Sequence, residues 1–311
     1  MSNGPEIVGL NQNERYNILK GPNGLRAGWR LLIFFAILCP IGYCANWGID
    51  PIMHALHADP YAPLGVTVLT GVLVPVLLLA SWIVSRIEGR SLAGYGLPWR
   101  RTFCLQFWQG AAISFASLTA LLLVLSFLGG FSFGSFSLHG ANIWKYGAAW
   151  ALPLFLGALL EDFFYRGYLL FTLTTGIGFW PAALVTSFLM GGAHYLNPGG
   201  HGLGPVAATG YCLVTCLVVR RTGDLWMPLG IHSAWSWGEA FFYGVPASGQ
   251  PGHGHLLNAS FHGPVWLTGG TFGPEASWPN IALLMIWWFI FSTWLRGVRY
   301  PNPAAISGPH L

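Results

Sequence analysis

Long apolar stretches alternate with short polar connections along most of the chain. A helix that crosses a membrane needs about 20 mostly apolar residues, and each of these stretches is close to that length or longer. They lie approximately at 29–48, 64–85, 107–130, 146–172, 178–196, 203–220, 224–246 and 278–297. The pattern predicts an all-α fold, a polytopic membrane helix bundle with about eight transmembrane helices.

The composition agrees with a bundle that lies in lipid. Hydrophobic residues make up 54% of the 311 residues and charged residues only 8%, whereas a soluble protein carries about 25% charged residues. So few charges cannot coat the surface of a soluble enzyme of this size, and most of the surface must therefore face a lipid bilayer. The same scarcity excludes a nucleic-acid-binding protein.

The positions of the basic residues predict the orientation of the bundle, because membrane proteins concentrate Lys and Arg in their cytoplasmic connections. On one side, the only Lys or Arg is Lys145, at a boundary; the connections on this side are 49–63, 131–145, 197–202 and 247–277. The other side holds Arg15, Lys20, Arg26, Arg30, Arg86, Arg90, Arg100, Arg101, Arg220, Arg221, Arg296 and Arg299. We therefore expect a multi-pass protein of the cell (inner) membrane with both termini in the cytoplasm.

Four charged residues lie inside apolar stretches: Glu161, Asp162, Arg166 and Glu239. An ionised side chain at the bilayer centre costs about 3 kcal/mol, so such groups normally face the bundle interior and have a function there. A spacing of four puts Asp162 and Arg166 on one helical face. The pair could be an ion pair that only fixes helix packing, or it could have a functional role, and both interpretations stay open. Glu161 lies about 100° away round the helix and needs another reason to be there.

Two histidines on other predicted helices supply such a reason, His194 in the fifth stretch and His232 in the seventh. With Glu161 they could activate water directly, the carboxylate as general base and the imidazoles as donors to a developing oxyanion. They could equally bind a metal as a site of two histidines and one carboxylate. Both alternatives lead to hydrolysis, and the cofactor stays open between zinc and none.

The depth of these residues in the membrane is an obstacle to one shared site. At 1.5 Å per residue, Glu161 and His232 lie roughly 10 Å from the cytoplasmic ends of their helices, and His194 roughly 24 Å from that of its own. Straight helices would not bring the three together. A fifth helix that begins deeper, tilts or is reshaped at Gly191 and Gly192 would remove the difficulty.

The seventh stretch adds two polar residues on roughly the face of His232. Ser236 follows by one turn and Glu239 by two. Ser236 could hydrogen-bond into the site or back to its own helix, and Glu239 could orient His232, line a water path or polarise helix packing. We expect both to support the site rather than to react.

The long connection 247–277 is rich in Gly, Pro and His. Such a composition is typical of a flexible connector. We favour that interpretation over a metal site at His253, His255 and His262.

The residues assembled above resemble the CPBP family of intramembrane proteases, the Abi-like group of CAAX prenyl proteases and bacteriocin-processing endopeptidases. The family's pattern is a Glu-Glu-x-x-x-Arg motif, a Phe-x-x-x-His motif and a His-x-x-x-Asn motif, each on its own helix. The first is present here as Glu161, Asp162 and Arg166. The second keeps His194 but has Met190 where the aromatic residue would be.

The third motif keeps His232 but has Ser236 in place of the Asn. An Asn side chain offers an amide donor and a carbonyl acceptor, whereas Ser offers one hydroxyl on a shorter arm. If the Asn position supplies an oxyanion donor, its loss costs about 3 kcal/mol, a factor of order 100 in rate.

The resemblance implies an integral membrane endopeptidase that hydrolyses a peptide bond in or near the bilayer, with a membrane-associated peptide or protein as its substrate. It makes Glu161 the residue that activates water and His194 and His232 its partners; these three would also be the ligands of a metal. The supporting residues would be Asp162, Arg166, Ser236 and Glu239. A non-catalytic membrane binding or bacteriocin-immunity-type protein that retains the pocket is the alternative, motivated by Met190 and Ser236. A small transporter is a third, but the inverted repeats of such proteins are not visible.

The apolar pattern and the resemblance together divide the chain into five parts. These are a cytoplasmic N-terminal tail (1–28), N-terminal transmembrane helices (29–145), a CPBP-like intramembrane protease core (146–250), a non-cytoplasmic loop (251–277), and the last transmembrane helix with a cytoplasmic tail (278–311).

Overall fold

Helices account for nearly all of the regular structure, as the apolar pattern predicts. The computed structural model describes residues 18–21 and 24–300. Its main helices are α2 (Ala27–Ala55), α3 (Pro63–Ile87), α4 (Leu105–Phe127), α5 (Ala141–Asp162), α6 (Leu170–Ile177), α7 (Phe179–His194), α8 (Leu203–Thr222), α9 (Trp226–Trp237) and α11 (Trp278–Trp294). Two π-helical stretches, η3 (Phe163–Leu169) and η4 (Gly238–Tyr243), continue α5 and α9.

Short elements occupy the connections. The two-residue strands β1 (Lys20–Gly21) and β2 (Gly24–Leu25) pair antiparallel, as do β3 (Phe131–Ser132) and β4 (Ser260–Phe261). The others are η1 (Leu92–Tyr95), η2 (Trp99–Arg101), α10 (Val265–Thr268), η5 (Gly270–Phe272) and η6 (Pro274–Ala276). The interpretation of 247–277 as a flexible connector is wrong, because this segment is built of short elements and pairs with β3.

Every stretch predicted to span the membrane coincides with a helix. Within the described residues, five helical segments are long and apolar enough to cross a membrane: α2, α3, α4, α8 and the continuous segment Ala141–Ile177. Helices α7 and α11 have 16 and 17 residues, and α9 has 12, or 18 with the 6 of its continuation η4, fewer than the roughly 20 of a full span. The chain is an integral membrane protein, and its all-α polytopic bundle is confirmed.

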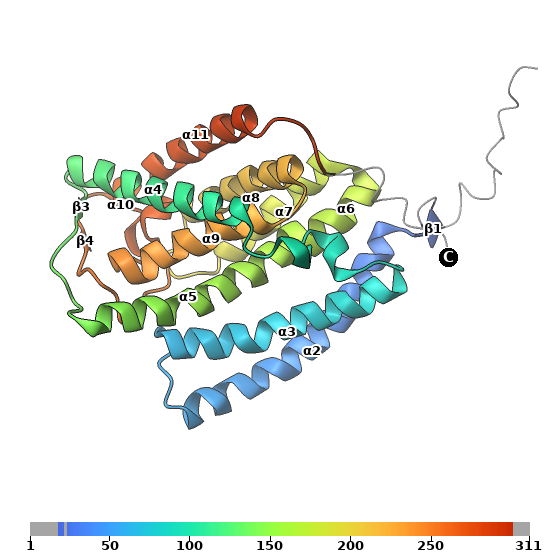
Figure 1. The fold of residues 1–311 in the computed structure, drawn as a ribbon, viewed down its shortest axis with the longest axis horizontal. Helices are drawn as coiled ribbons and strands as arrows, with labels where there is room; N and C mark the ends of the chain where they lie inside the picture. Colours follow the sequence, from blue (N-terminus) through green and yellow to red (C-terminus); the bar gives the residue numbers. More distant parts are fainter. Residues whose placement is uncertain (1–17, 22–23, 301–311) are drawn as a thin grey trace, which may run out of the picture.

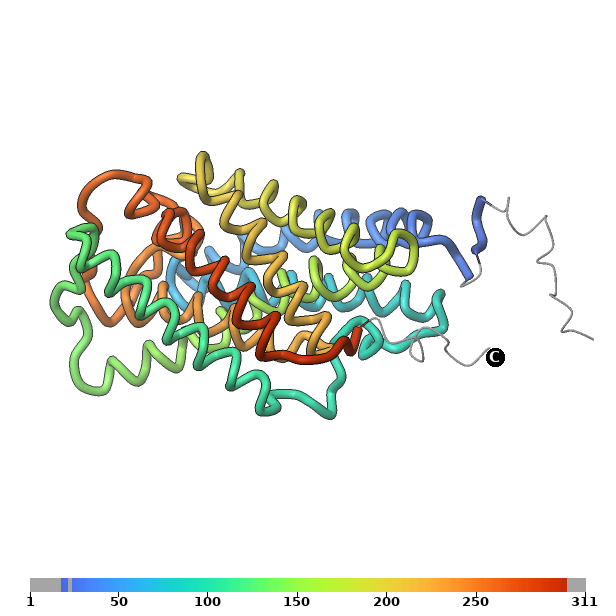
Figure 2. The backbone as a smooth tube through the Cα atoms, turned by 90° about the horizontal axis from the view of Figure 1, so that it is seen from above, coloured from blue at the N-terminus to red at the C-terminus, as the bar shows by residue number. Residues whose placement is uncertain are grey.

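Figure 1 shows how the helices are arranged. Helices α2 and α3 pack against each other at one edge of the molecule, α3 packs against α5, and α5 against α9. On the other side of α9 lies α4, while α8 contacts both α7 and α11. In Figures 1 and 2 the described chain begins and ends at the same end of the bundle.

Helices α4 and α9 approach closely because glycines lie in their contact. A Cβ added at Gly230 would stand 2.0 Å from the carbonyl oxygen of Phe107, and one at Gly110 would stand 2.4 Å from that of Met227. Small residues let helix backbones come together in membranes, where van der Waals packing drives their association. This contact fixes the position of α9, and with it His232.

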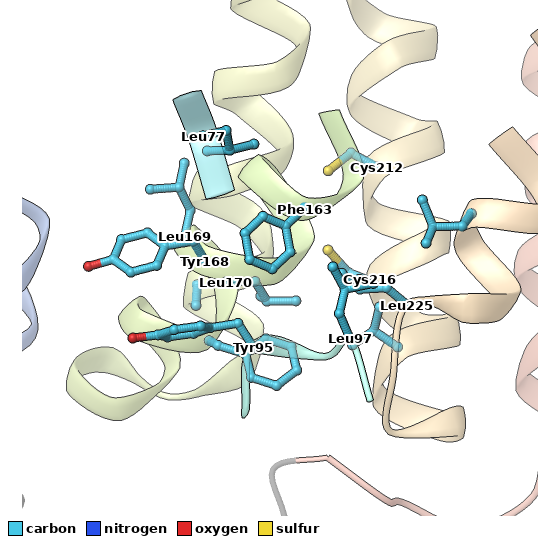
Figure 3. Close-up of a cluster of buried hydrophobic side chains, with 14 of the residues drawn as sticks. Leu77, Tyr95, Leu97, Phe163, Tyr168, Leu169, Leu170, Cys212, Cys216 and Leu225 are labelled. Carbon is cyan, nitrogen blue, oxygen red and sulfur yellow. The ribbon is translucent and has the colours of Figure 1, made fainter. Parts of the chain in front are cut away.

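The largest buried cluster surrounds η3 (Figure 3). Its aromatic members Tyr95, Phe163 and Tyr168 are completely buried. The side chains labelled in the close-up are Leu77, Tyr95, Leu97, Phe163, Tyr168, Leu169, Leu170, Cys212, Cys216 and Leu225. Stretches of π-helix inside longer helices are frequent at functional sites, and this one begins directly after Asp162.

The basic connections, which were predicted to share one side of the membrane, are in contact with one another. Arg101 forms an ion pair with Asp224 at 2.7 Å, and burial raises the pKa of that carboxyl. The backbone N–H of Arg299 donates to the carbonyl oxygen of Arg220 at 3.0 Å. The connections between α3 and α4, between α8 and α9, and after α11 therefore meet at one end of the bundle.

Candidate active site

The two histidines that were predicted to act together line one cavity. His194 is the last residue of α7, and His232 lies in the middle of α9. The cavity has a volume of about 40 Å³, and its lining comes from α7, α8, α9, α11 and the connection 247–277. A water molecule needs roughly 10–15 Å³ of such volume, so the cavity has room for water beside the two imidazoles.

The segment that carries Glu161 accounts for the depth of the site. It continues to Ile177, so Glu161 lies about as far from the end of its helix as His194 lies from Phe179, the start of α7. Helix α7 ends at His194, and the chain turns back into α8 after eight residues, 195–202. The Nδ1 atom of His194 lies 2.9 Å from the carbonyl oxygen of Met190. Because a carbonyl oxygen only accepts, Nδ1 carries the proton, and Nε2 is the nitrogen left for chemistry.

Asp162 joins the first motif to the third. Its Oδ1 accepts a hydrogen bond from Nδ1 of His232 at 3.0 Å and also pairs with Arg166. Both charged side chains are fully buried. The guanidinium carbon of Arg166 lies 4.9 Å from the ring centroid of Tyr211, and Nη2 donates to the sulfur of Met190 at 3.3 Å. The ion pair expected from the spacing of four is present, and it also orients a candidate catalytic histidine.

Glu161 faces a different space. It lines a groove of about 420 Å³ between α2, α3 and the junction of α5 with η3. One of its carboxylate oxygens, Oε2, is buried without a hydrogen-bond partner among the described residues. Glu161 still lies within electrostatic range of His232. The structure thus brings the two histidines together and places Glu161 on the groove rather than in their cavity.

The two supporting residues predicted beyond His232 are not among the residues that line the cavity. Ser236 is partly buried. Glu239 lies in η4, is completely buried and lies within electrostatic range of Glu275.

Sequence reasoning missed three residues that line the cavity beside the histidines: Ser248, Glu275 in η6, and Asn280 on α11. The backbone N–H and the hydroxyl of Ser248 donate to Oε2 of Glu275 at 2.8 and 2.5 Å. Glu275 is the lone carboxylate of residues 247–277. That isolation in an apolar chain is the signal that could have singled it out.

The predicted metal ligands do not gather. Within the part of the chain that the structure describes, no three His, Cys, Asp or Glu side chains lie close enough to hold a metal ion. Glu161 lines the groove, whereas His194 and His232 line the cavity. The three therefore do not fit as the ligands of one zinc ion.

Comparison with known proteins gives one match. Residues 142–238 match the family model described as "Rce1-like: Type II CAAX prenyl endopeptidase Rce1-like". The matched segment runs from α5 into the start of η4 and contains all three motifs, so the resemblance drawn from those motifs is confirmed. No curated protein and no solved structure matches the chain.

Proposed function

We propose that this chain, whose residues 142–238 match the CAAX protease family model, is a membrane endopeptidase that hydrolyses a peptide bond in or near the bilayer. The substrate is a membrane-associated peptide or protein, of which a prenylated CAAX peptide is the case that the family description names. The observation that carries the proposal is the cavity shared by His194 and His232, tied to the first motif through Asp162.

In the proposed reaction Glu161 is the general base. The water oxygen bonds to the carbonyl carbon of the substrate while Glu161 takes one of the water's protons, and the carbonyl oxygen becomes an oxyanion. The imidazoles of His194 and His232, protonated at both nitrogens before the water attacks, donate to that oxyanion through Nε2 and keep these protons throughout the step. The intermediate then collapses, the carbon–nitrogen bond breaks, and the leaving amine takes up a proton.

Asp162 prepares His232 for this role. The carboxylate accepts from Nδ1 of His232, which fixes the tautomer and the ring orientation, as the buried Asp does for the histidine of a Ser-His-Asp triad. A carboxylate beside an imidazole also stabilises the imidazolium. The neighbouring Arg166 balances the buried negative charge of Asp162.

The groove beside Glu161 suits the apolar part of a substrate. Its lining is mostly aliphatic and aromatic, with Asn46 and Glu161 as the polar members. Ligand sites are commonly concave and mainly apolar, with a few polar groups that set orientation. A chain lying between α2 and α3 would present its scissile bond to Glu161.

We further propose that the end of the bundle where the basic connections meet lies in the cytoplasm and that the protein resides in the cell (inner) membrane. Lys and Arg are enriched in cytoplasmic connections. In this orientation the connection 247–277, which lines the cavity, lies on the non-cytoplasmic side.

The test is cleavage of a farnesylated CAAX peptide by the purified protein in lipid vesicles. Glu161→Gln, His194→Ala and His232→Ala should each lower kcat/KM by roughly 100-fold or more, because each removes a group that acts in the transition state. The matched control is His139→Ala, an exposed histidine outside both the cavity and the groove, which should cleave like the wild type. Equal cleavage by all five proteins would refute the proposal.

A non-catalytic binding or bacteriocin-immunity-type protein is the second candidate, and the position of Ser236 away from the cavity favours it. It predicts that Glu161→Gln keeps the cellular phenotype. It also predicts that Gly230→Leu abolishes the phenotype, since a Cβ there would stand 2.0 Å from the carbonyl oxygen of Phe107. Loss of the phenotype in Glu161→Gln would exclude this candidate.

A further inference from the structure

A second glutamate shares the cavity with both histidines. Glu275 lies in η6, far along the chain from the segment 142–238 that matches the family. It lines the cavity together with His194 and His232 and lies within electrostatic range of both. His232 is also within range of Glu161, so this imidazole interacts with a carboxylate from the groove and a carboxylate from the cavity.

The surroundings of Glu275 hold its carboxyl group in place. Ser248 donates twice to Oε2, through its backbone N–H and its hydroxyl. The amide Nδ2 of Asn280 donates to the backbone carbonyl of Glu275 at 2.8 Å. Asn280 is itself anchored at the start of α11, where its N–H donates to the hydroxyl of Ser277 at 3.3 Å. A loop carboxyl held this way has a fixed direction.

The cavity is polar beyond its ionisable groups. The hydroxyl of Tyr211 and Oδ1 of Asn280 are both buried without a hydrogen-bond partner among the described residues. Asn280 is only 4% exposed. Buried polar atoms of this kind are normally satisfied by ordered water, so the lining suits a water that links Glu275 with the imidazoles.

Glu275 is placed to hold a proton. Burial raises the pKa of its carboxyl above the ordinary value of a glutamate, and this effect outweighs the opposing effects of Ser248, His194 and His232. A further buried carboxyl, Glu239 in η4, interacts with it electrostatically, and two nearby carboxyls resist ionising together.

We propose that Glu275 is the general acid of the reaction, the group that protonates the leaving amine nitrogen. This inference rests on the proposed function and adds the step that Glu161 and the histidines leave open. Water gives one proton to Glu161 as the carbon–oxygen bond forms. Glu275 gives its proton to the nitrogen as the carbon–nitrogen bond breaks, and the proton on Glu161 then returns to Glu275 through the histidines and water. Two glutamates held in different environments thus divide base and acid roles.

The test compares two leaving groups. One substrate is the farnesylated CAAX peptide, and the other is the same peptide with an activated aryl ester in place of the scissile amide, whose phenolate leaves without a proton. Glu275→Gln should lower kcat on the peptide by roughly 100-fold, in line with loss of an acid catalyst, and leave the ester rate nearly unchanged. Glu161→Gln should slow both substrates, because both require activated water.

Each outcome separates the two proposals. If Glu275→Gln slows peptide and ester equally, Glu275 has a structural role and the acid assignment fails while the endopeptidase stands. If Glu161→Gln and His194→Ala cleave both substrates as the wild type does, the proposed function itself fails. Partial recovery of the peptide rate in Glu275→Asp supports the assignment, since a carboxyl acid is restored.

A second measurement does not depend on the substrate. Infrared difference spectra of wild type and Glu275→Gln in vesicles at neutral pH should reveal a protonated carboxyl band that the variant lacks. Asp224→Asn is the control, because Asp224 is also a buried carboxyl but lies outside the cavity, and it should leave the Glu275 band in place. Absence of a Glu275 band at neutral pH would overturn the assignment even if no peptide is cleaved.

Discussion

The groove beside Glu161 and the cavity beside His194 and His232 are built for different occupants. The groove measures about 420 Å³ and opens between α2, α3 and the end of α5. The cavity measures about 40 Å³ and is lined by α7, α8, α9, α11 and the connection 247–277. The groove is the larger space and has room for an apolar chain, whereas the cavity holds the two imidazoles and Glu275 and has room for water.

Two adjacent residues mark the boundary between these spaces. Glu161 lines the groove, whereas Asp162 bonds His232, which lines the cavity. Consecutive helical residues point about 100° apart, so one turn of helix can serve both sides. The first motif therefore separates the groove from the cavity and contributes one residue to each side.

The largest expected effect comes from removing the ion pair between Asp162 and Arg166 in the first motif. Asp162→Asn removes the charge that pairs with the fully buried Arg166. Removing one partner of a buried ion pair costs about 3–5 kcal/mol, because the other charge stays buried without compensation. Chemical unfolding in detergent should show this loss of stability, together with loss of peptide cleavage.

A double variant distinguishes the charge from the shape of the site. Asp162→Asn combined with Arg166→Met removes both charges, so most of the lost stability should return. Cleavage should remain low, because Asp162 no longer supports the imidazolium of His232. If Asp162→Asn lowers the free energy of unfolding by less than about 1 kcal/mol, the range of an exposed pair, the Asp162–Arg166 pair does not stabilise this part of the bundle.

The sequence was sufficient to predict the helices, because apolar runs near 20 residues have few other structures open to them. It also predicted the Asp162–Arg166 pair, since a spacing of four on a helix is a local property. It did not predict that the helical segment carrying Glu161 continues to Ile177, beyond the expected end at 172. Where a helix ends inside a bundle depends on packing by distant segments, and the local pattern does not report it.

The site was predicted less completely than the fold. The pairing of His194 with His232 followed from three motifs on three helices, but Glu275 and Ser248 lie in a connection that we interpreted as a flexible linker. Their approach to the cavity depends on β4 pairing with β3 and on η6 packing under α11. Such long-range contacts produce no periodic pattern of apolar residues in the sequence. The polar composition of a loop therefore gave no guide to its function.

The next prediction compares a variant in the groove with a variant in the cavity. Gly42→Leu puts a side chain into the groove at a position where a Cβ meets nothing within 4 Å. Apolar burial of one leucine is worth about 1.5–3 kcal/mol, so a substrate displaced from that area should show KM raised about 10- to 100-fold with kcat little changed. Ala208→Leu instead fills the cavity from α8 and should lower kcat, because the water is excluded.

Gly48→Leu is the control for the groove variant. Gly48 lies on the same helix, a Cβ there also meets nothing within 4 Å, and the residue is not among those that line the groove. It should leave both kinetic constants unchanged. If Gly42→Leu and Ala208→Leu alter the same constant in the same way, the groove and the cavity do not have separate roles.

The smallest effect concerns the link between the two regions at their outer end. His253, in the connection that lines the cavity, donates through Nδ1 to the carboxylate of Asp59 at 2.5 Å and through its backbone N–H to the carbonyl oxygen of Tyr61 at 2.8 Å. Asp59 and Tyr61 lie between α2 and α3, the helices of the groove. The hydrogen bond from His253 lowers the pKa of Asp59, so this contact stabilises the fold above the ordinary pKa of an aspartate and is lost as the pH falls through the lowered value.

Asp59→Asn should therefore cost less than about 1 kcal/mol, as expected of an exposed pair, and should abolish that acidic dependence. Hydrogen exchange of the amides around His253 should rise at neutral pH in the variant, and the wild type should approach the variant's rate at acidic pH. Asp50→Asn is the control: it removes the charge of another exposed carboxylate, on α2, and should leave the exchange unchanged. If Asp59→Asn speeds exchange without altering KM for the peptide, the connection moves independently of the groove; if KM rises as well, the two regions are coupled through this contact.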